Sequence, residues 1–335
     1  MANVSIKDVA RAARVSHPTV SRALRHSSLV KPDTAERIRS IARRMGYRPS
    51  AVARSLVTRR TKTIGVVVTT IADPFISEVV SGIEEVANEN GYSVVLANSN
   101  ADPEREVQVA HSFHERRVDG ILVTASRVGA RYLPLLSEMK VPVVLINSHH
   151  PAEFVYSVRI DNVTASRAAT AHLIELGHKR IAYIGDRFGF QSDTERFSGY
   201  REALERADLP FLPQLVVHGD GKAEGGLHAI ATLMAMPDPP TAVFCYNDMC
   251  AIGALSGIRQ RGLRVPNDIS IVGFDDLLIA SYTHPPLTTV HQPKQQMGRA
   301  AMRILLELFS NAQSITNIKM QGELIVREST APPTR

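Results

Sequence analysis

The chain has 335 residues and a net charge of +6, with 44% hydrophobic and 21% charged residues, as in an ordinary globular protein. It holds neither a run of about eighteen apolar residues nor an N-terminal signal-peptide pattern, so we expect a cytoplasmic protein without a membrane partner. Cys245 and Cys250 have a spacing that suits neither a zinc knuckle nor a redox pair, and we expect buried, reduced thiols.

The charge of the chain is unevenly distributed. Residues 1–62 carry fifteen Lys or Arg against three acidic residues, a net charge of +12, so the remaining residues sum to −6. A polyanion is therefore attracted to the N-terminal part and mildly repelled by the rest. A small basic head on an acidic body is typical of a nucleic-acid-binding module joined to a sensing or assembly module.

Two short helices that meet at a tight turn are predicted at the start of the head. Ser5 is placed to cap the first helix, and Ser16 is placed to cap the second, which has Pro18 in its first turn. Arg14 lies in the turn between them. If this residue is left-handed, an arginine there costs about 1 kcal/mol.

A third helix is predicted after Pro32, with Gly46 as its left-handed C-cap. Three such helices form a helix-turn-helix unit, whose second helix enters the major groove of DNA. The alternative is a small three-helix bundle with a solvated basic face. The charge excess favours DNA binding, as do the hydrogen-bonding side chains on the outer face of the second helix: His17, Thr19, Ser21, Arg22 and Arg25.

The head resembles the lactose-repressor and purine-repressor (LacI/GalR) family of bacterial transcriptional regulators in three stretches: residues 5–10, 15–24 and 46–56. The resemblance implies that the stretch after Tyr47 is a hinge helix, ordered when two subunits dock in the minor groove, and that Leu56 wedges between base pairs. In the residues themselves, Ser50 is a cap, Ala53 suits a narrow groove, and Leu56 is an apolar wedge or equally a core leucine. Alone, such a helix is too short to be stable, so we expect its folding to be coupled to DNA binding.

Arg22 is the residue that we expect to contact guanine with two hydrogen bonds, worth about 1–3 kcal/mol of discrimination. His17 and Pro18 match variable specificity positions of the family, and Pro18 can offer only an apolar contact, for example to a thymine methyl group. The expected DNA-binding residues are Ser5, Ser16, His17, Pro18, Thr19, Ser21, Arg22, Tyr47, Ser50, Ala53 and Leu56.

From residue 63 onward, short apolar runs alternate with amphipathic helices. The runs are near-continuously apolar, which is typical of parallel strands buried on both faces. The expected strands are 64–68, 93–96, 120–123, 142–146, 180–184, 215–217, 242–245, 269–274 and 323–326. The expected helices are 77–91, 104–117, 132–139, 163–177, 196–207, 223–235, 248–262 and 293–309.

This order predicts an N-terminal all-α helix-turn-helix head followed by an α/β core of two doubly wound parallel-sheet lobes. The resemblance implies the same periplasmic-binding-protein-like core. The expected parts are a DNA-binding domain at 1–49, a hinge helix and linker at 50–62, and a core at 63–335. In the core we expect an N-lobe of about 63–161 and 293–322 and a C-lobe of about 162–292 and 323–330.

Ligands of open α/β sheets bind at the carboxyl ends of the strands. In this chain those positions hold carboxylates and amides, which suit a polyol or a sugar; Asn147 and Asp161 are two of them. By resemblance, Arg196, Asn247 and Asp275 match residues that contact an effector, and Phe75 matches an aromatic or apolar wall. The expected effector-binding residues are Phe75, Asn147, Asp161, Arg196, Asn247 and Asp275.

Some of these positions have a structural alternative. Phe75 could equally be a core residue, and Asp73, Asp248 and Asp276 each stand where a helix needs an N-cap; capping is favoured for Asp248 and Asp276. Where several family members carry an aromatic residue that stacks on the ligand, this chain has Gly219-Asp220-Gly221, and it contains no Trp. A flat, purine-like effector is therefore less favoured than a sugar.

The sequence shows no glycine-rich phosphate loop, nucleophile elbow or metal-ligand helix, so we expect neither an enzyme nor a cofactor or metal. The rival classes are a sugar-binding receptor without DNA function and an enzyme on the same scaffold; a receptor would carry a signal peptide and lack the basic head. We expect a repressor that binds double-stranded DNA at a near-palindromic operator and is controlled by a small sugar-like effector. Because the C-terminus has no leucine heptad, a homodimer is expected rather than a tetramer.

Overall fold

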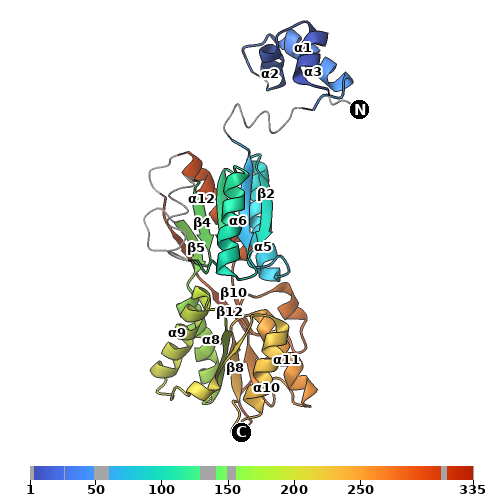
Figure 1. The fold of residues 1–335 in the computed structure, drawn as a ribbon. Coiled ribbons are helices and arrows are strands. Elements are labelled where there is room, and N and C mark those ends of the chain that lie inside the picture. Colours follow the sequence, from blue (N-terminus) through green and yellow to red (C-terminus); the bar gives the residue numbers. More distant parts are fainter. Residues whose placement is uncertain are drawn as a thin grey trace. The chain divides into compact units, whose positions relative to one another are not determined.

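The computed structural model describes residues 4–25, 27–48, 60–128, 141–148, 156–310 and 315–334. The chain divides into two compact units, Met1–Thr61 and Lys62–Arg335 (Figure 1). We call the first the head and the second the core. The expected hinge helix with Ser50, Ala53 and Leu56, and the expected helix at 132–139, lie outside the described residues.

The head begins with helices α1 (Ile6–Ala13) and α2 (His17–Leu24), as predicted. The Ser5 side chain accepts a hydrogen bond from the Asp8 backbone N–H, and the Asp8 side chain accepts one from the Ser5 N–H. These reciprocal bonds form a capping box, which satisfies two otherwise unpaired donors. Ser16 caps α2 by accepting a hydrogen bond from the Thr19 backbone N–H. Arg14, between the two helices, is left-handed, with φ 52° and ψ 46°.

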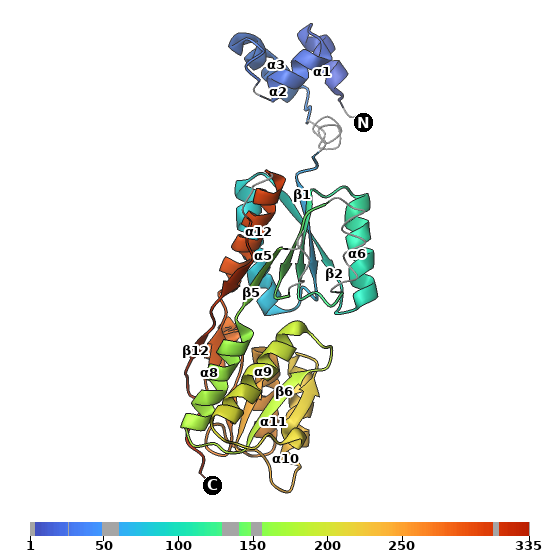
Figure 2. The same cartoon turned by 90° about the vertical axis from the view of Figure 1, so that its left-hand side faces the viewer.

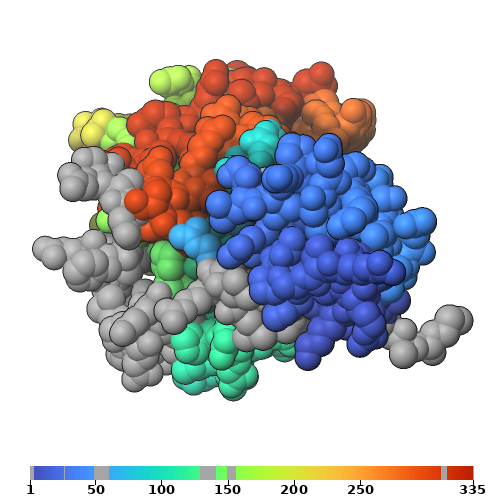
Figure 3. All heavy atoms as spheres, turned by 90° about the horizontal axis from the view of Figure 1, so that it is seen from above, coloured from blue at the N-terminus to red at the C-terminus, as the bar shows by residue number. Residues whose placement is uncertain are grey.

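Helix α3 (Pro32–Arg44) completes the head and is followed by Gly46 at φ +68°, the left-handed position predicted for it. The three helices share one small core, and Figure 3 shows the surface of this unit in blue. Its buried side chains are Val9, Ala10, Ala13, Val20, Ala23, Val30, Ala35, Ile38 and Ala42.

The N-lobe of the core is built on a six-stranded parallel sheet of order β11-β5-β4-β3-β1-β2. Its strands are β1 (Thr63–Val68), β2 (Ser93–Asn98), β3 (Gly120–Thr124), β4 (Val143–Ile146), β5 (Tyr156–Ile160) and β11 (Ile318–Met320). Helices α5 (Pro74–Glu89) and α12 (Lys294–Phe309) cover one face, and α6 (Pro103–Glu115) covers the other (Figure 2). The near-continuous apolar strands are thus buried between layers of helices, as expected.

Helices α5 and α12 come from distant parts of the sequence and cross closely through two glycines. A Cβ atom at Gly82 would overlap the carbonyl oxygen of Gln295, and one at Gly298 would overlap that of Val79. Only glycine permits this approach of the two backbones. The C-terminal helix α12 is therefore an integral layer of the N-lobe.

The C-lobe is built on a four-stranded parallel sheet of order β7-β6-β8-β9. Its strands are β6 (Ile181–Asp186), β7 (Val216–Gly219), β8 (Ala242–Cys245) and β9 (Ser270–Val272). Helices α8 (Asn162–Glu175) and α9 (Gln191–Arg206) pack on one face, and α10 (Ala223–Met234) and α11 (Asp248–Gln260) pack on the other. Short 3₁₀ turns, η2 (Pro213–Leu215) and η3 (Leu278–Tyr282), precede β7 and follow β9.

Three chain segments cross between the lobes, at residues 160–162, 291–294 and 320–323. Beside two of them, β10 (Thr289–His291) and β12 (Glu323–Ile325) pair as an antiparallel ribbon. The sequence pattern missed β5, β10 and β11, because these strands are short and mix apolar with polar residues. None of the described helices is long and apolar enough to cross a bilayer.

Candidate functional site: a DNA-binding face and an interlobe cavity

Helix α2 presents a polar face that the core of the head leaves free. His17, Pro18 and Arg22 are exposed, whereas Thr19 and Ser21 are half-buried. The Arg22 side chain forms no hydrogen bond or ion pair with any described residue, whereas Arg11 pairs with Asp8. An unpaired, exposed guanidinium on this face is available for a base edge or a phosphate.

Other expected DNA-binding residues cap the helices of the head or pack on its core. Ser5 and Ser16 are the N-caps of α1 and α2, and the Ser16 hydroxyl also lies 2.8 Å from the Thr19 hydroxyl. Tyr47 is half-buried against the core of the head. N-cap residues sit at the positive end of a helix, so a DNA phosphate could approach both caps.

In the core, a cavity of about 700 Å³ lies between the two lobes. Its walls come from the segments that follow β1, β2, β3 and β4 in the N-lobe and β6, β7, β8 and β9 in the C-lobe. The carboxyl ends of the strands therefore meet at one site, as expected for this fold. Five of the six expected effector-binding residues line it: Phe75, Asn147, Arg196, Asn247 and Asp275.

Arg196 is the most tightly held of these residues and is only 2% exposed. It donates from Nε to Asn162 Oδ1 (3.0 Å) and from Nη1 to the Tyr246 carbonyl (2.6 Å). Its guanidinium lies 3.7 Å from the centre of the Phe274 ring. This fixed orientation presents the remaining N–H groups toward Asp275, 3.7 Å away, and toward the cavity.

Asp275 carries the opposite charge to Arg196 and is also buried. Its Oδ1 accepts a hydrogen bond of 2.6 Å from Gln292 Nε2. Burial raises the pKa of this carboxyl, and the neighbouring Arg196 opposes the rise. The backbone at Asp275 has φ 120°, a region that L-residues rarely adopt, and this strain is typical of residues held for function.

Phe75 and the two asparagines complete the expected set. Phe75 is the second residue of α5, whose N-cap Asp73 accepts a hydrogen bond from the Phe75 N–H (2.9 Å). Asn247 caps α11 through Cys250 N–H (2.9 Å). Asn147 is left-handed at φ +56°, and its Oδ1 is buried without a hydrogen-bond partner among the described residues.

Three expectations about aspartates need correction. Asp161 does not line the cavity; it caps α8 through Thr164 N–H (3.2 Å), and its other oxygen lies 2.8 Å from Lys319 Nζ. Capping by Asp248 and Asp276 was wrong, because Asn247 caps α11 and no helix begins at Asp276.

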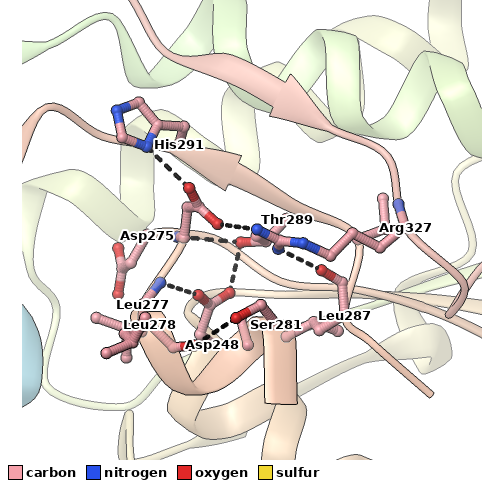
Figure 4. A network of polar contacts seen from close by, with 12 residues as sticks. Asp248, Asp275, Leu277, Leu278, Ser281, Leu287, Thr289, His291 and Arg327 are labelled. Carbon is pink, nitrogen blue, oxygen red and sulfur yellow. Dashed lines mark hydrogen bonds and ion pairs between the residues drawn. The ribbon is translucent and has the colours of Figure 1, made fainter. Parts of the chain in front are cut away.

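Asp248 instead belongs to a polar network (Figure 4), and Asp276 pairs with two of its members, His291 and Arg327. The fully buried Asp248 accepts hydrogen bonds from Leu277 N–H (2.7 Å) and the Thr289 hydroxyl. Burial raises the pKa of Asp248 to about 7, although these two hydrogen bonds oppose the rise. Asp276 lies 2.6 Å from Arg327 and 2.9 Å from His291, which keep its pKa low against the opposing effect of burial.

Several residues of the cavity were not singled out from the sequence. They lie at the end of β6 or after β6 and β7, where the loops could not be aligned or looked like plain turns: Asp186, Phe188, Ser192, Asp220 and Lys222. Their only signal is their position at strand ends. Cys245 and Cys250 are buried free thiols, as expected. In the described parts of the chain no three His, Cys, Asp or Glu side chains form a group that could hold a metal ion.

Comparisons with known proteins agree with this geometry. The model of bacterial regulatory proteins, lacI family, matches residues 5–50, and that of the periplasmic binding protein-like domain matches residues 170–330. The chain is 37% identical over 329 residues to the HTH-type transcriptional repressor PurR of Haemophilus influenzae (strain PittEE), covering 97% of this chain and 98% of the relative. It is 37% identical over 328 residues to the HTH-type transcriptional regulator RegA of Clostridium saccharobutylicum, covering 97% and 99%.

Two solved structures are similar along almost the whole chain. The lac repressor dimer bound to operator and the anti-inducer ONPF superposes with a TM-score of 0.88 at 27% identity, covering 98% of this chain and 100% of that one. The complex of the transcriptional regulator CelR with cellobiose superposes with a TM-score of 0.74 at 34% identity, covering 98% and 100%.

Proposed function

Because the chain belongs to the lacI family of bacterial regulatory proteins and is a DNA-binding transcriptional regulator, we propose that a sugar-like effector controls its binding to a near-palindromic operator. The observation that carries the effector class is the composition of the interlobe cavity. Carboxylates, amides and hydroxyls alternate there with the rings of Phe75, Phe188, Phe190 and Tyr246. Acceptors and donors around apolar faces suit a ring that carries several hydroxyl groups.

The regulator is proposed to act as a homodimer. The lac repressor, which superposes with the higher TM-score of the two structures above, is a dimer bound to its operator. In this chain, large apolar side chains are exposed on both lobes: Leu278, Ile279 and Tyr282 of η3, and Ile71 and Leu96 near β1 and β2. A soluble protein rarely exposes such side chains together unless a partner covers them, and two copies of one chain give a self-complementary face.

Effector binding is proposed to change DNA affinity by moving the lobes. Residues on both lobes line the cavity, so a ligand that contacts both favours one relative position of the lobes. In a dimer, that choice is proposed to change how well the two heads can bind one operator together. Linkage then requires that DNA changes the affinity for the effector by the same factor.

The test separates effector response from operator binding. An operator is selected from random duplexes, and its affinity is measured by fluorescence anisotropy with sugars, nucleosides and purines supplied in turn. Asp275→Ala and Arg196→Lys should abolish the response to the active compound while leaving operator affinity unchanged. The control Asp161→Ala, outside the cavity, should respond normally. A response only to purines or nucleosides would overturn the sugar assignment, and a normal response of both cavity variants would overturn the site.

A further inference from the structure

One carboxylate of the cavity has an oxygen with no partner. Asp186 is the last residue of β6, lines the cavity and is only 4% exposed. Its Oδ1 accepts a hydrogen bond from the Phe188 N–H, whereas its Oδ2 is buried and has no hydrogen-bond donor among the described residues. A buried acceptor without a donor is unfavourable and calls for an explanation, such as a ligand that supplies one.

A glycine lies close to this oxygen. Gly221, in the loop after β7, has φ +71° and also lines the cavity. A Cβ atom there would lie 3.5 Å from Asn247 Nδ2 and 4.0 Å from Asp186 Oδ2. A larger side chain at position 221 would occupy the corner of the cavity next to Asp186 Oδ2. Glycine leaves the corner to a ligand.

The charges around the corner decide what it can bind. Asp220 also lines the cavity and lies 3.9 Å from Arg187, and Asp193, which is not part of the cavity lining, accepts a hydrogen bond at Oδ1 from the Tyr183 hydroxyl (2.7 Å). Both carboxylates add to the effect of burial and raise the pKa of Asp186 to about 6, against the opposing charge of Arg127. No described cation lies within ion-pair distance of Asp186. The free oxygen of Asp186 therefore attracts a hydrogen-bond donor or a cation and repels an anion, whereas Arg196 and Lys222 line the same cavity at other positions.

A second free acceptor lies on the other lobe. Asn147 Oδ1 is also buried without a partner and belongs to a residue of the same cavity. The two free acceptors therefore stand on opposite lobes. A ligand with at least two donors could satisfy both and hold the lobes together.

We propose that Asp186 is a specificity-determining residue whose Oδ2 accepts a hydrogen bond from a hydroxyl or protonated amine of the effector. The cavity then takes neutral sugars and amino sugars and rejects sugar phosphates and sugar acids. This proposal rests on the proposed sugar-like effector and adds its charge class. A hydroxyl group and a protonated amine can both donate a hydrogen bond to Asp186, and the experiment below distinguishes them.

The test uses the full-length protein and titration calorimetry. The probes are neutral sugars, each with its amine, phosphate and acid derivative; for glucose these are glucosamine, glucose 6-phosphate and gluconate. A neutral or amino sugar should bind at least about tenfold more tightly than its anionic derivatives. If the ligand presents an amine, the amino sugar should exceed the neutral parent, and Asp186→Asn should remove that preference.

Asp186→Asn keeps the size of the side chain and should weaken the bound sugar by about 10- to 100-fold while weakening the rejection of the acid derivative. The latter gain cannot come from misfolding. The control Asp193→Asn, in the same acidic group but outside the cavity, should change affinity less than threefold.

Unchanged affinity in Asp186→Asn, or equal binding of anionic and neutral probes to the wild type, would overturn the role of Asp186 alone. Binding of no sugar to the wild type would overturn the proposed effector class, and the role of Asp186 with it.

Discussion

Lys294 Nζ donates a hydrogen bond of 2.7 Å to the carbonyl oxygen of Asp275. Lys294 is the first residue of α12 in the N-lobe, whereas Asp275 lies in the cavity wall of the C-lobe. The same ammonium group donates to the Asp276 carbonyl (2.7 Å) and lies 3.7 Å from Glu78 of α5. One buried cation thus joins the two lobes at the edge of the cavity.

Replacing Lys294 with Met should lower the free energy of unfolding of the core by about 3 kcal/mol, because two buried carbonyl groups lose their donor. Urea denaturation followed by circular dichroism measures this loss. The control is Lys319→Met, since Lys319 is half-exposed and its ion pair among the described residues is with Asp161, so its loss should be below about 1 kcal/mol. Equal losses in the two variants would show that the Lys294 bridge contributes no more than a surface ion pair.

Arg22→Ala should weaken binding to the selected operator by about 10- to 100-fold while changing binding to random duplex less than threefold. The reason is that a base contact adds only to specific binding, whereas phosphate contacts add to both. Competition anisotropy at fixed salt measures the two affinities. Arg43→Ala is the matched control, because Arg43 is exposed on α3 and paired with Glu36. If Arg22→Ala weakens both kinds of duplex equally, Arg22 contacts phosphate.

Arg14→Gly should stabilise the head by about 1 kcal/mol, because Arg14 is held at φ 52°, where glycine has no steric penalty. Arg11→Gly, three residues earlier and inside α1, should destabilise the head by about the same amount. Thermal melts followed by circular dichroism at 222 nm compare the two variants. The opposite ordering would contradict the left-handed turn.

Tyr282→Asp should convert the protein to a monomer and reduce operator affinity, because Tyr282 is 75% exposed in η3 beside Leu278 and Ile279. A charge in the apolar centre of an interface is strongly unfavourable. Sedimentation velocity measures the mass of the particle. The control is Leu29→Asp, because Leu29 is 76% exposed on the head, and this variant should leave the dimer intact. A wild-type monomer on operator DNA would contradict the proposed assembly.

Asp248 should make the stability of the core depend on pH. Its pKa in the folded protein, about 7, is above that of an unfolded aspartate, so the folded state holds the proton more tightly. Stability from this group is therefore fully present below about pH 4 and is lost as the pH rises toward 7, by up to about 1.4 kcal/mol per pH unit. The neighbouring charges are Asp276, which adds to the rise in pKa, and Lys294, which opposes it.

Urea denaturation between pH 5 and 8 tests this. Asp248→Asn should remove most of the decline, because an amide does not ionise and can still accept one hydrogen bond. Other titrating groups, such as His178, act on both proteins and cancel in the difference. Parallel pH profiles for the two proteins would show that Asp248 stays charged.

The sequence predicts best what depends on near neighbours in the chain. Ser5, Ser16 and Gly46 act on the helix next to them, and all three caps were predicted correctly. Arg196 and Asp275 could be placed at the cavity by resemblance together with the rule for strand ends. These two sources do not depend on the details of loops.

The failures have the opposite origin. Asp248 looked like a cap, but the structure gives it a partner, Thr289, 41 residues away. Asp161 does not line the cavity but forms an ion pair with Lys319, which is distant from it in the sequence. Asp186 was missed because its distinguishing property is a buried oxygen without a hydrogen-bond donor, and only the folded structure shows that no described donor lies near it. Local patterns carry no information about such distant partners.

The contact of α12 with α5 through Gly82 and Gly298 has a practical consequence. A gene fragment that stops at residue 160 would encode five strands of the N-lobe sheet but neither α12 nor β11, and the part of the sheet face that α12 covers beside α5 would be exposed. Neither lobe can be cut out as one continuous stretch of polypeptide. A single proteolytic cut at any of the three crossings would likewise leave the lobes covalently joined through the other two. The two lobes therefore have to be expressed and folded together.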